Sequence, residues 1–246
     1  MNGQFQRTEL LLGTPVMQAL NNCRVLLFGV GGVGSWCAES LIRSGVGHLT
    51  MVDSDVVVAS NLNRQLMATV DTLGMPKVEA MRKRLLSINP DADIQARQEI
   101  FSAENADDFR LSDYDYVIDA IDSLQNKADL IRLATASTPT LFSSMGAALK
   151  LAPQQIRVAE FWKVKGCPLA RALRNKFKRQ GDYPKRKFQC VYSPELLQNQ
   201  LPQGESEEQW AAKKAQVNGT VMHAVATFGL TLAGLVIQDV YSKQQS

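Results

Sequence analysis

Residues 24–35 read RVLLFGVGGVGS, and this stretch decides the fold. It begins with a short apolar run typical of a buried strand, and the residues after it, Ser35–Ser44, have the apolar spacing of a helix. The glycines between the two elements match the pattern G-x-G-x-x-G, with one further glycine inside it. These loop residues are Gly29, Gly31, Gly32 and Gly34. Glycine permits a tight turn and lets backbone N–H groups approach a ligand, and a helix N-terminus attracts anions, so the stretch predicts a phosphate-binding loop.

Strands and helices alternate on either side of this loop. The expected strands after it are His48–Val52, Asp93–Arg97, Tyr116–Ala120 and Leu141–Ser144. The other expected helices are Thr8–Asn21, Pro76–Leu86 and Leu124–Ala136. Strands that alternate with helices of about ten or more residues favour a parallel sheet with helices on both faces. The expected fold class is therefore α/β, with a Rossmann-like, mostly parallel mixed sheet.

The alternation changes after Gly146. A strand is expected at Gln155–Phe161, and a final helix is expected at Asn218–Tyr241. Between them, residues 163–204 are basic and are interrupted by four prolines, so we expect this segment to include a mobile loop. The expected division is a single domain, 1–246, made of a nucleotide-binding part, 1–146, and a second part, 147–246.

Positive charge is concentrated in one part of the chain. The net charge is only +3, yet residues 163–187 hold ten basic side chains and one acidic side chain. An otherwise acidic chain with one strongly basic segment indicates a local contact with a polyanion. The aromatic residues interleaved with or following these cations are Phe177, Tyr183, Phe188 and Tyr192. We expect them to stack unpaired RNA bases, the alternative being a solvated basic loop without a partner.

The composition is that of an ordinary globular protein, with 45% hydrophobic and 21% charged residues. Residues 1–13 lack the pattern of a secretory signal, so we expect a cytoplasmic protein. The four cysteines form no C-x-x-C pair, which argues against a paired-cysteine zinc site and against a disulfide scaffold. The long apolar segment Val221–Ile237 is interrupted by one histidine, two glycines and two threonines. We therefore expect a buried core or interface helix there, and no membrane span.

Asp53 ends the second expected strand, 19 residues after Gly34. A carboxylate at this place can accept hydrogen bonds from ribose hydroxyls. The glycine loop and Asp53 suit a nicotinamide cofactor as well as ATP, so they do not decide between a dehydrogenase and an ATP-dependent enzyme.

Other polar residues follow further strands at the same edge of the expected sheet. They include Arg64 on the loop after Asp53, Lys77 at the start of a helix, and Asp122 beyond the strand at 116–120. Because open α/β sheets bind ligands at the carboxyl ends of their strands, we expect these side chains to converge. Cations neutralise charge on a leaving pyrophosphate and a carboxylate holds Mg²⁺, whereas hydride transfer needs neither. This set therefore favours ATP and Mg²⁺.

Several motifs in fixed order resemble a known family. They are GVGGVGS at 29–35, DSDVVVASNLNRQ at 53–65, GMPKVE at 74–79 and DAIDS at 119–123. Together they look like the ubiquitin-activating-enzyme superfamily of ThiF-like adenylating enzymes, over about residues 5–144. The resemblance implies that ATP is bound by Gly29, Gly31, Gly32, Gly34, Asp53, Asp55, Asn61, Arg64, Gln65 and Lys77. It also implies catalytic roles for Arg64, Lys77, Asp122 and Arg7. Asp122 would hold Mg²⁺, and Arg7 would reach the ATP of the partner in a homodimer.

Other strings are similar to one branch of this superfamily, the tRNA threonylcarbamoyladenosine dehydratases. They are KVKGCPLARALR at 163–174, CVYSPE at 190–195 and ATFG at 226–229. In this branch the threonylcarbamoyl carboxylate attacks the α-phosphate of ATP and pyrophosphate leaves. The carbamoyl group of the same substituent then displaces AMP and closes a ring, so that water is lost overall. The tethered attacking group has a large effective concentration, so no enzyme nucleophile is required.

The resemblance also sets the expected partners. These are tRNA, contacted near its anticodon by the part at 147–246, and a second copy of the chain, with the final helix in the interface. A sulfur-transfer or accessory protein is left open. The main alternative is an adenylyltransferase for a small ubiquitin-like sulfur carrier, although such enzymes usually carry paired cysteines. A non-catalytic nucleotide-binding protein is a further alternative.

A few single residues admit two interpretations. Asp119 lies inside a strand, where orienting backbone or cationic groups is as reasonable as catalysis. His223 is expected to be a hydrogen-bonded core or interface histidine, and Cys37 a packing residue. Cys190 lies in the basic region, where a thiolate would be favoured, so a thioester intermediate stays open.

Overall fold

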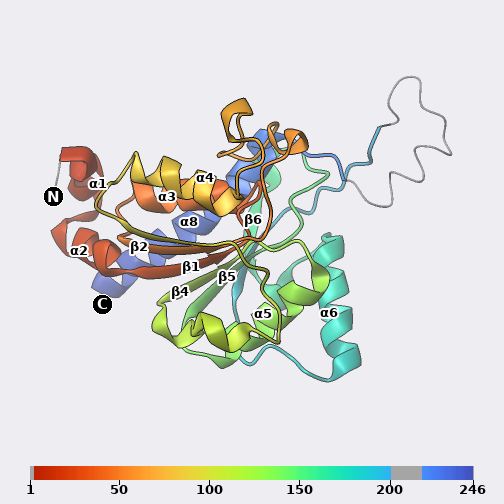
Figure 1. Ribbon diagram of the computed structural model, residues 1–246. Helices are drawn as coiled ribbons and strands as arrows, with labels where there is room; N and C mark the ends of the chain where they lie inside the picture. The colour runs from red at the N-terminus through yellow and green to blue at the C-terminus, as the bar shows by residue number, and fades with distance from the viewer. Residues whose placement is uncertain (1–2, 201–217, 246) are drawn as a thin grey trace.

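The computed structural model describes residues 3–200 and 218–245, which build a single seven-stranded sheet (Figure 1). Its strands are β1 (Arg24–Phe28), β2 (His48–Val52), β3 (Asp93–Arg97), β4 (Tyr116–Asp119), β5 (Thr140–Ser144), β6 (Arg157–Glu160) and β7 (Gln189–Tyr192). The order across the sheet is β3-β2-β1-β4-β5-β7-β6. All neighbours are parallel except β6 and β7, so the sheet is mixed and mostly parallel as the sequence predicts.

Helices cover both faces of the sheet. They are α1 (Gln6–Leu12), α2 (Thr14–Asn22), α3 (Gly34–Arg43), α4 (Lys77–Leu86), α5 (Leu124–Ala136), α6 (Pro168–Gln180) and α8 (Met222–Gln245). Short 3-10 helices lie at Gly3–Phe5, Ala59–Asn61, Val70–Thr72, Ala106–Phe109, Leu111–Asp113, Pro153–Gln155 and Phe161–Lys163. In Figure 1, α3, α4 and α8 lie on one face of the sheet and α5 and α6 on the other.

The strand order places the candidate site. β1 and β4 are neighbours, yet the chain leaves β1 toward β2 and reaches β4 only after β3. The connections after β1 and β4 therefore diverge to opposite faces and open a crevice at the carboxyl ends of these strands. In α/β sheets such a reversal of strand order is where ligands bind.

The part of the chain after Gly146 continues the same sheet, because β7 pairs with β5 in parallel. The C-terminal helix α8 returns to pack against α3, next to the glycine loop. At Gly229 the two helices approach so closely that a Cβ would collide with backbone atoms of Val33 and Cys37. The boundary expected near residue 146 is thus crossed by both strand pairing and helix packing.

One expectation about secondary structure is wrong, and two elements of the basic segment were not expected from the sequence. The leading helix is broken at Gly13, whose φ of +84° ends α1 and starts α2. The basic segment is mostly ordered where the structure describes it: 168–180 form α6 and 189–192 form β7. Ala170, Leu173 and Phe177 recur at helical spacing and are buried, which explains why α6 docks on the sheet. The last residues of the expected loop, 201–204, lie outside the described part of the chain.

Within the described residues, α8 is the one helix long and apolar enough to cross a membrane. Half of its most apolar window is buried inside the protein, against α3 and the sheet. This burial agrees with the core or interface helix that the sequence predicts.

Candidate nucleotide-binding site

The glycine loop has the tight geometry that its sequence predicts. Gly29 has a φ of +88°, and a Cβ there would lie 2.6 Å from the carbonyl oxygen of Ala120. A Cβ on Gly34 would collide with the carbonyl oxygen of Gly29. A side chain at either position would therefore force the loop away from β4 or unfold the turn, and helix α3 could not begin at Gly34.

Asp53 and Lys77 lie together beside this loop. One carboxylate oxygen of Asp53 accepts a hydrogen bond from the Val30 backbone N–H at 2.7 Å, which fixes the loop against the end of β2. Lys77 Nζ lies 2.6 Å from Asp55 Oδ2 and 3.9 Å from Asp53 Oδ1. Burial raises the pKa of Asp53, although Lys77 and two backbone N–H groups act in the opposite direction. The lysine is only 6% exposed, so its ammonium is held in place before any ligand binds.

Arg64 and Gln65 lie on the other side of the loop. A Cβ at Gly32 would be 3.3 Å from Arg64 Cγ, and a Cβ at Gly31 would be 3.9 Å from Gln65 Nε2. The Arg64 backbone is anchored by the Trp36 indole N–H, which donates to the Arg64 carbonyl at 3.1 Å. Burial lowers the pKa of Arg64 while the charge of Asp122 raises it, so these two side chains interact electrostatically.

Gln65 and Asn61 are buried polar residues within this group. Gln65 Oε1 is a buried oxygen without a hydrogen-bond partner among the described residues. A buried acceptor without a donor is costly, so it points to a ligand donor in the crevice. Asn61 Oδ1 accepts from the Val58 backbone N–H at 3.1 Å and closes the turn that carries Arg64. Asn61 thus shapes the loop in addition to any contact with a ligand.

Asp119 is part of a fully buried cluster behind the site. Lys127 Nζ lies 2.8 Å from Asp119 Oδ2 and donates to the Ile121 carbonyl at 2.9 Å, and both charged side chains are 0% exposed. The Ser143 hydroxyl donates to Asp119 at 2.6 Å, and the Ile121 N–H donates at 3.1 Å. Of the two interpretations of Asp119, the structure favours orientation of backbone and cationic groups.

This cluster, which we call the Asp119 clamp (Asp119, Lys127, Ser143 and the Ile121 peptide groups), bends the chain after β4 and presents Asp122 at the surface. Lys127 and Ser143 were missed in the sequence. A lysine in the first turn of a helix reads as solvated surface, and only its spacing from a strand-end aspartate could have signalled the ion pair.

The structure does not bring Arg7 to the other site residues of the same chain. Arg7 lies exposed on α1, which packs near Gly45, at the end of the sheet opposite the glycine loop (Figure 1). Any contact between Arg7 and bound nucleotide therefore requires a second copy of the chain.

The interpretation of the aromatic residues in the basic segment is wrong for three of the four. Phe177, Phe188 and Tyr192 are buried in the core between the sheet and α6, so they cannot stack RNA bases. Tyr183 is exposed, and its ring lies 6.1 Å from the ring of Trp162, which is also exposed. The alternation of cations and aromatics arises because one face of α6 packs on the core.

Some of the basic side chains also have structural contacts. Arg186 donates to the carbonyl of Thr135 in the last turn of α5 and to that of Pro139 just after the helix, both at 2.9 Å. Arg174 donates to the Phe161 carbonyl at 3.1 Å. Their charges are therefore committed to stabilising the fold, and fewer than ten cations remain free for a polyanion.

The structure argues against a thiolate at Cys190, and it confirms that His223 is hydrogen-bonded while placing it outside the core. Cys190 is completely buried in β7, and burial raises its pKa well above the usual range, so a thiolate is disfavoured there. Cys37 is buried in α3 as a packing residue, as expected. His223 is exposed at the start of α8, and its Nε2 lies 2.7 Å from the Leu151 carbonyl oxygen.

The fold and this site define a class of protein. A family model for the ThiF family matches residues 5–243, so the chain belongs to that family. The relatives differ in how much of the chain they match. The tRNA threonylcarbamoyladenosine dehydratase of Bacillus subtilis is 35% identical over 243 residues, which cover 96% of this chain and 94% of the relative. The molybdopterin-synthase adenylyltransferase of Escherichia coli is 35% identical over 161 residues, covering 65% of this chain and 62% of the relative.

Solved structures of the Escherichia coli tRNA N6-threonylcarbamoyladenosine dehydratase resemble the present fold over almost its whole length. The complex with AMP superimposes with a TM-score of 0.87 at 32% identity and covers 98% of this chain and 95% of the other. The complex with ATP has a TM-score of 0.84 at 31% identity with the same coverage. The family therefore includes a relative of nearly the same length whose solved structures contain AMP or ATP.

Proposed function

We propose that this chain is an ATP-dependent tRNA threonylcarbamoyladenosine dehydratase that acts in the cytoplasm. The observation that supports this most strongly is the extent of the similarity. Dehydratase relatives match between 72% and 98% of the chain, whereas the sulfur-carrier and molybdopterin adenylyltransferases match 52% and 65% of it. The C-terminal part is where a tRNA enzyme and a carrier-protein enzyme must differ, because their substrates differ.

The crevice suits ATP through residues already fixed in place. Backbone N–H groups of the loop Gly29–Gly34 and the N-terminus of α3 would hold phosphates. The carboxylate oxygens of Asp53 and Asp55 would accept hydrogen bonds from the ribose hydroxyls. The Gln65 oxygen, which has no partner among the described residues, would accept a hydrogen bond from an N–H or O–H of the nucleotide. Asn61 would complete the wall on the Arg64 side.

Arg64 and Lys77 would act on the phosphates during the reaction. Lys77 would leave Asp55 in part and donate to the α-phosphate as the carboxylate attacks it, since its ammonium lies beside the loop. Arg64 would neutralise charge on the departing pyrophosphate. The carbamoyl group then displaces AMP within the same substituent, so the chain must position the substrate and exclude water, and it needs no nucleophile of its own.

Mg²⁺ would be held by Asp122 together with phosphate oxygens. Among the described residues, no cluster of three or more His, Cys, Asp or Glu side chains could form a metal site by itself. Mg²⁺ commonly binds to one or two carboxylates plus substrate phosphates, so an exposed Asp122 next to Arg64 suits that arrangement. When bound, the ion would neutralise charge on the phosphates.

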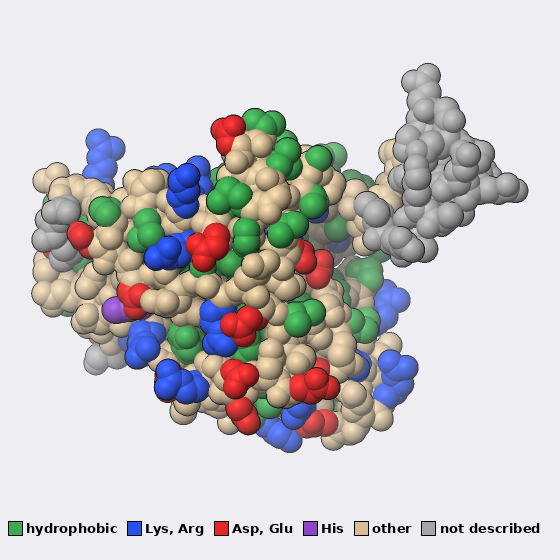
Figure 2. Space-filling view, in the orientation of Figure 1, with side chains coloured by type: hydrophobic (Ala, Val, Ile, Leu, Met, Phe, Trp, Pro, Cys, Tyr) green, Lys and Arg blue, Asp and Glu red, His purple; other side chains and the backbone are tan. Residues whose placement is uncertain are grey.

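A homodimer would complete the site through Arg7. On the same helix, Leu10 and Leu11 are exposed to 81% and 80%, which is unusual for neighbouring leucines in a lone chain. Figure 2 shows apolar side chains gathered over the loop between β2 and α4, where Val58 and Leu62 are exposed close to Arg64. We propose that the leucines of one copy cover this loop of the other and carry Arg7 to its ATP.

Mixing two inactive variants tests this arrangement. Arg7→Ala and Asp122→Ala are each expected to be inactive, but a mixed dimer contains one site with both wild-type residues. Random pairing should restore about a quarter of the wild-type activity. A mixture that stays inactive after subunit exchange would contradict the shared site, as would a monomeric mass at all concentrations.

The proposed activity is tested by incubating the protein with ATP, Mg²⁺ and tRNA that bears threonylcarbamoyladenosine. We expect the modified nucleoside to lose one water molecule and AMP to form in equal amount, as measured by mass spectrometry and chromatography. Pyrophosphate exchange that responds to a sulfur-carrier protein and not to tRNA would instead support the adenylyltransferase.

A further inference from the structure

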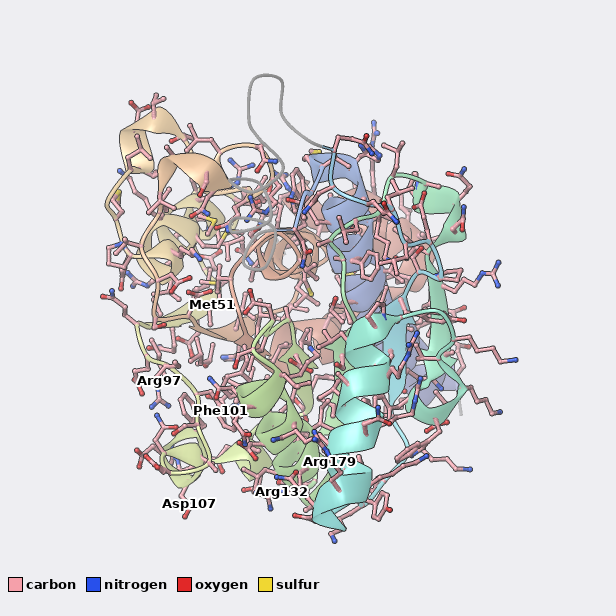
Figure 3. All side chains as sticks on the ribbon, turned by 90° about the vertical axis from the view of Figure 1, so that its right-hand side faces the viewer. Met51, Arg97, Phe101, Asp107, Arg132 and Arg179 are labelled. Atoms are coloured by element: carbon pink, nitrogen blue, oxygen red, sulfur yellow. The ribbon has the colours of Figure 1, made fainter. Side chains whose placement is uncertain are left out.

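A groove between α5 and α6 opens beside the nucleotide crevice. It has a volume of about 440 Å³ and is lined by Leu124, Ala172, Asn175, Lys178 and Arg179. Leu124 is the first residue of α5 and follows Asp122 by two positions, so the groove begins next to the proposed Mg²⁺ ligand. Arg179, labelled in Figure 3, lies on the side of α6 that faces α5.

The groove has an apolar floor and a cationic rim. Leu124 and Ala172 supply the apolar side chains, and Asn175 adds an amide that can donate and accept. Lys178 and Arg179 have no ion-pair partner in residues 3–200 and 218–245, unlike Lys185, which pairs with Asp182. The first turn of α5 contributes further positive potential, because its N-cap residue Ser123 makes no side-chain capping bond.

The helix that carries the groove's cations is anchored to its surroundings. Lys176 Nζ donates to Gln125 Oε1 at 2.5 Å and ties α6 to the first turn of α5. Phe177 on the opposite side of α6 is buried in the core. Lys178 and Arg179 are therefore presented by a helix whose opposite face is fixed in the core, so the backbone needs little ordering when an anion binds.

We infer that this groove binds an unpaired nucleotide of the tRNA, next to the modified adenosine. This inference rests on the proposed function, and it adds a second place at which the same tRNA substrate contacts the protein. The base would lie against Leu124 and Ala172 and use Asn175 for a hydrogen bond, while Lys178 and Arg179 bind the phosphate that links it to the modified adenosine. Unpaired nucleotides are recognised by this combination of a flat apolar contact and cations at the backbone.

The occupant follows from charge and position. A groove with two unpaired cations and no acidic side chain in its lining suits an anion, and its apolar floor suits a flat ring. Because the groove lies beside Asp122, a ligand in it is close in space to the group that reacts with ATP, as a neighbouring nucleotide of the same RNA would be. A nucleotide of the substrate RNA satisfies both conditions, whereas a free anion satisfies only the first.

The test compares variants of the groove with a matched control. Lys178→Glu/Arg179→Glu reverses the charge of the rim, and Ala172→Glu places a carboxylate on the floor. Lys83→Glu is the control, because Lys83 is likewise an exposed helical lysine but lies on α4, on the other face of the sheet. Binding of an anticodon stem-loop RNA is measured by fluorescence anisotropy without ATP, and KM is measured for tRNA and for ATP.

We expect both groove variants to weaken RNA binding and raise the KM for tRNA by about tenfold or more, with the KM for ATP unchanged. The double variant should also lessen the slope of log Kd against log salt by about one for each phosphate that the rim no longer neutralises. The control should behave as the wild type. An unchanged Kd and KM for tRNA in both groove variants overturns the inference, even if the wild type converts tRNA. A wild type that binds no RNA overturns it together with the proposed function.

Discussion

The Asp119 clamp gives the sharpest expectation about how the site is held together. Lys127→Met keeps the length of the side chain and removes its ammonium. The Asp119 carboxylate then keeps the Ser143 hydroxyl and the Ile121 N–H, but it stays 0% exposed with no cation, and the Ile121 carbonyl loses its donor. Removing one partner of a buried ion pair costs about 3–5 kcal/mol, because the remaining charge has neither solvent nor partner.

For a chain of 246 residues, each kcal/mol of lost stability lowers Tm by roughly 2–4 °C, so we expect a decrease of roughly 6–20 °C. The assay is chemical and thermal unfolding followed by circular dichroism. Lys127→Met/Asp119→Asn should recover part of the loss, because it removes the uncompensated charge. Lys83→Met, a surface control, should change the free energy of unfolding by no more than about 0.5 kcal/mol.

The same variant should also affect catalysis through Asp122, which the clamp positions without contacting substrate. We expect the Mg²⁺ concentration that gives half-maximal activity to rise in Lys127→Met, at a temperature where the variant is folded. A variant that loses less than about 1 kcal/mol of stability and keeps the wild-type Mg²⁺ dependence would refute the reasoning about the clamp.

Three further expectations follow from the crevice and the thiols. The Gly29→Ala variant should be clearly less stable than the Gly74→Ala variant. Both glycines have a positive φ, but only at Gly29 would the new Cβ collide with a backbone carbonyl, so equal Tm values of the two variants would contradict this. Lys77→Met should lower kcat about 100-fold or more, measured as AMP formation, and a smaller effect would remove Lys77 from the reaction. Native buried thiols should resist iodoacetamide at about pH 8, because burial raises the pKa of Cys23 to about 12 and raises the pKa values of Cys37 and Cys190 well above the usual thiol range. Rapid labelling of the native protein, detected by mass spectrometry, would reopen a thioester route. The thiols concerned are Cys23, Cys37 and Cys190.

The nucleotide-binding part of the fold could be predicted because its signals are local. The strands at 24–28, 48–52 and 93–97 have the bounds that the sequence predicts. Pro76 precedes α4 as a helix-start signal should. That Arg64 and Asp122 lie close together could be predicted because both follow strands whose carboxyl ends meet at the same edge of the sheet, which requires no knowledge of side-chain packing.

The misjudged features depend on packing between distant segments. Helix α6 was hidden by its many cations, since its buried face consists of only a few residues, among them Leu173 and Phe177. The sequence around Cys190 suggests a basic, open region because its neighbours along the chain are charged, whereas in space β7 lies between the buried strand β5 and the edge strand β6. Lys127 could not be recognised as a buried ion-pair partner until the bend after β4 was known.

The most direct test of the account is where an oxygen atom goes in a single turnover. The threonylcarbamoyl carboxylate of the tRNA is labelled with ¹⁸O and converted with ATP and Mg²⁺, and the phosphorus products are analysed by mass spectrometry. If the carboxylate attacks the α-phosphate at the loop Gly29–Gly34, one labelled oxygen must appear in AMP and none in pyrophosphate. Unlabelled AMP, or label in inorganic phosphate, would show that the carboxylate is not adenylated and would contradict the account.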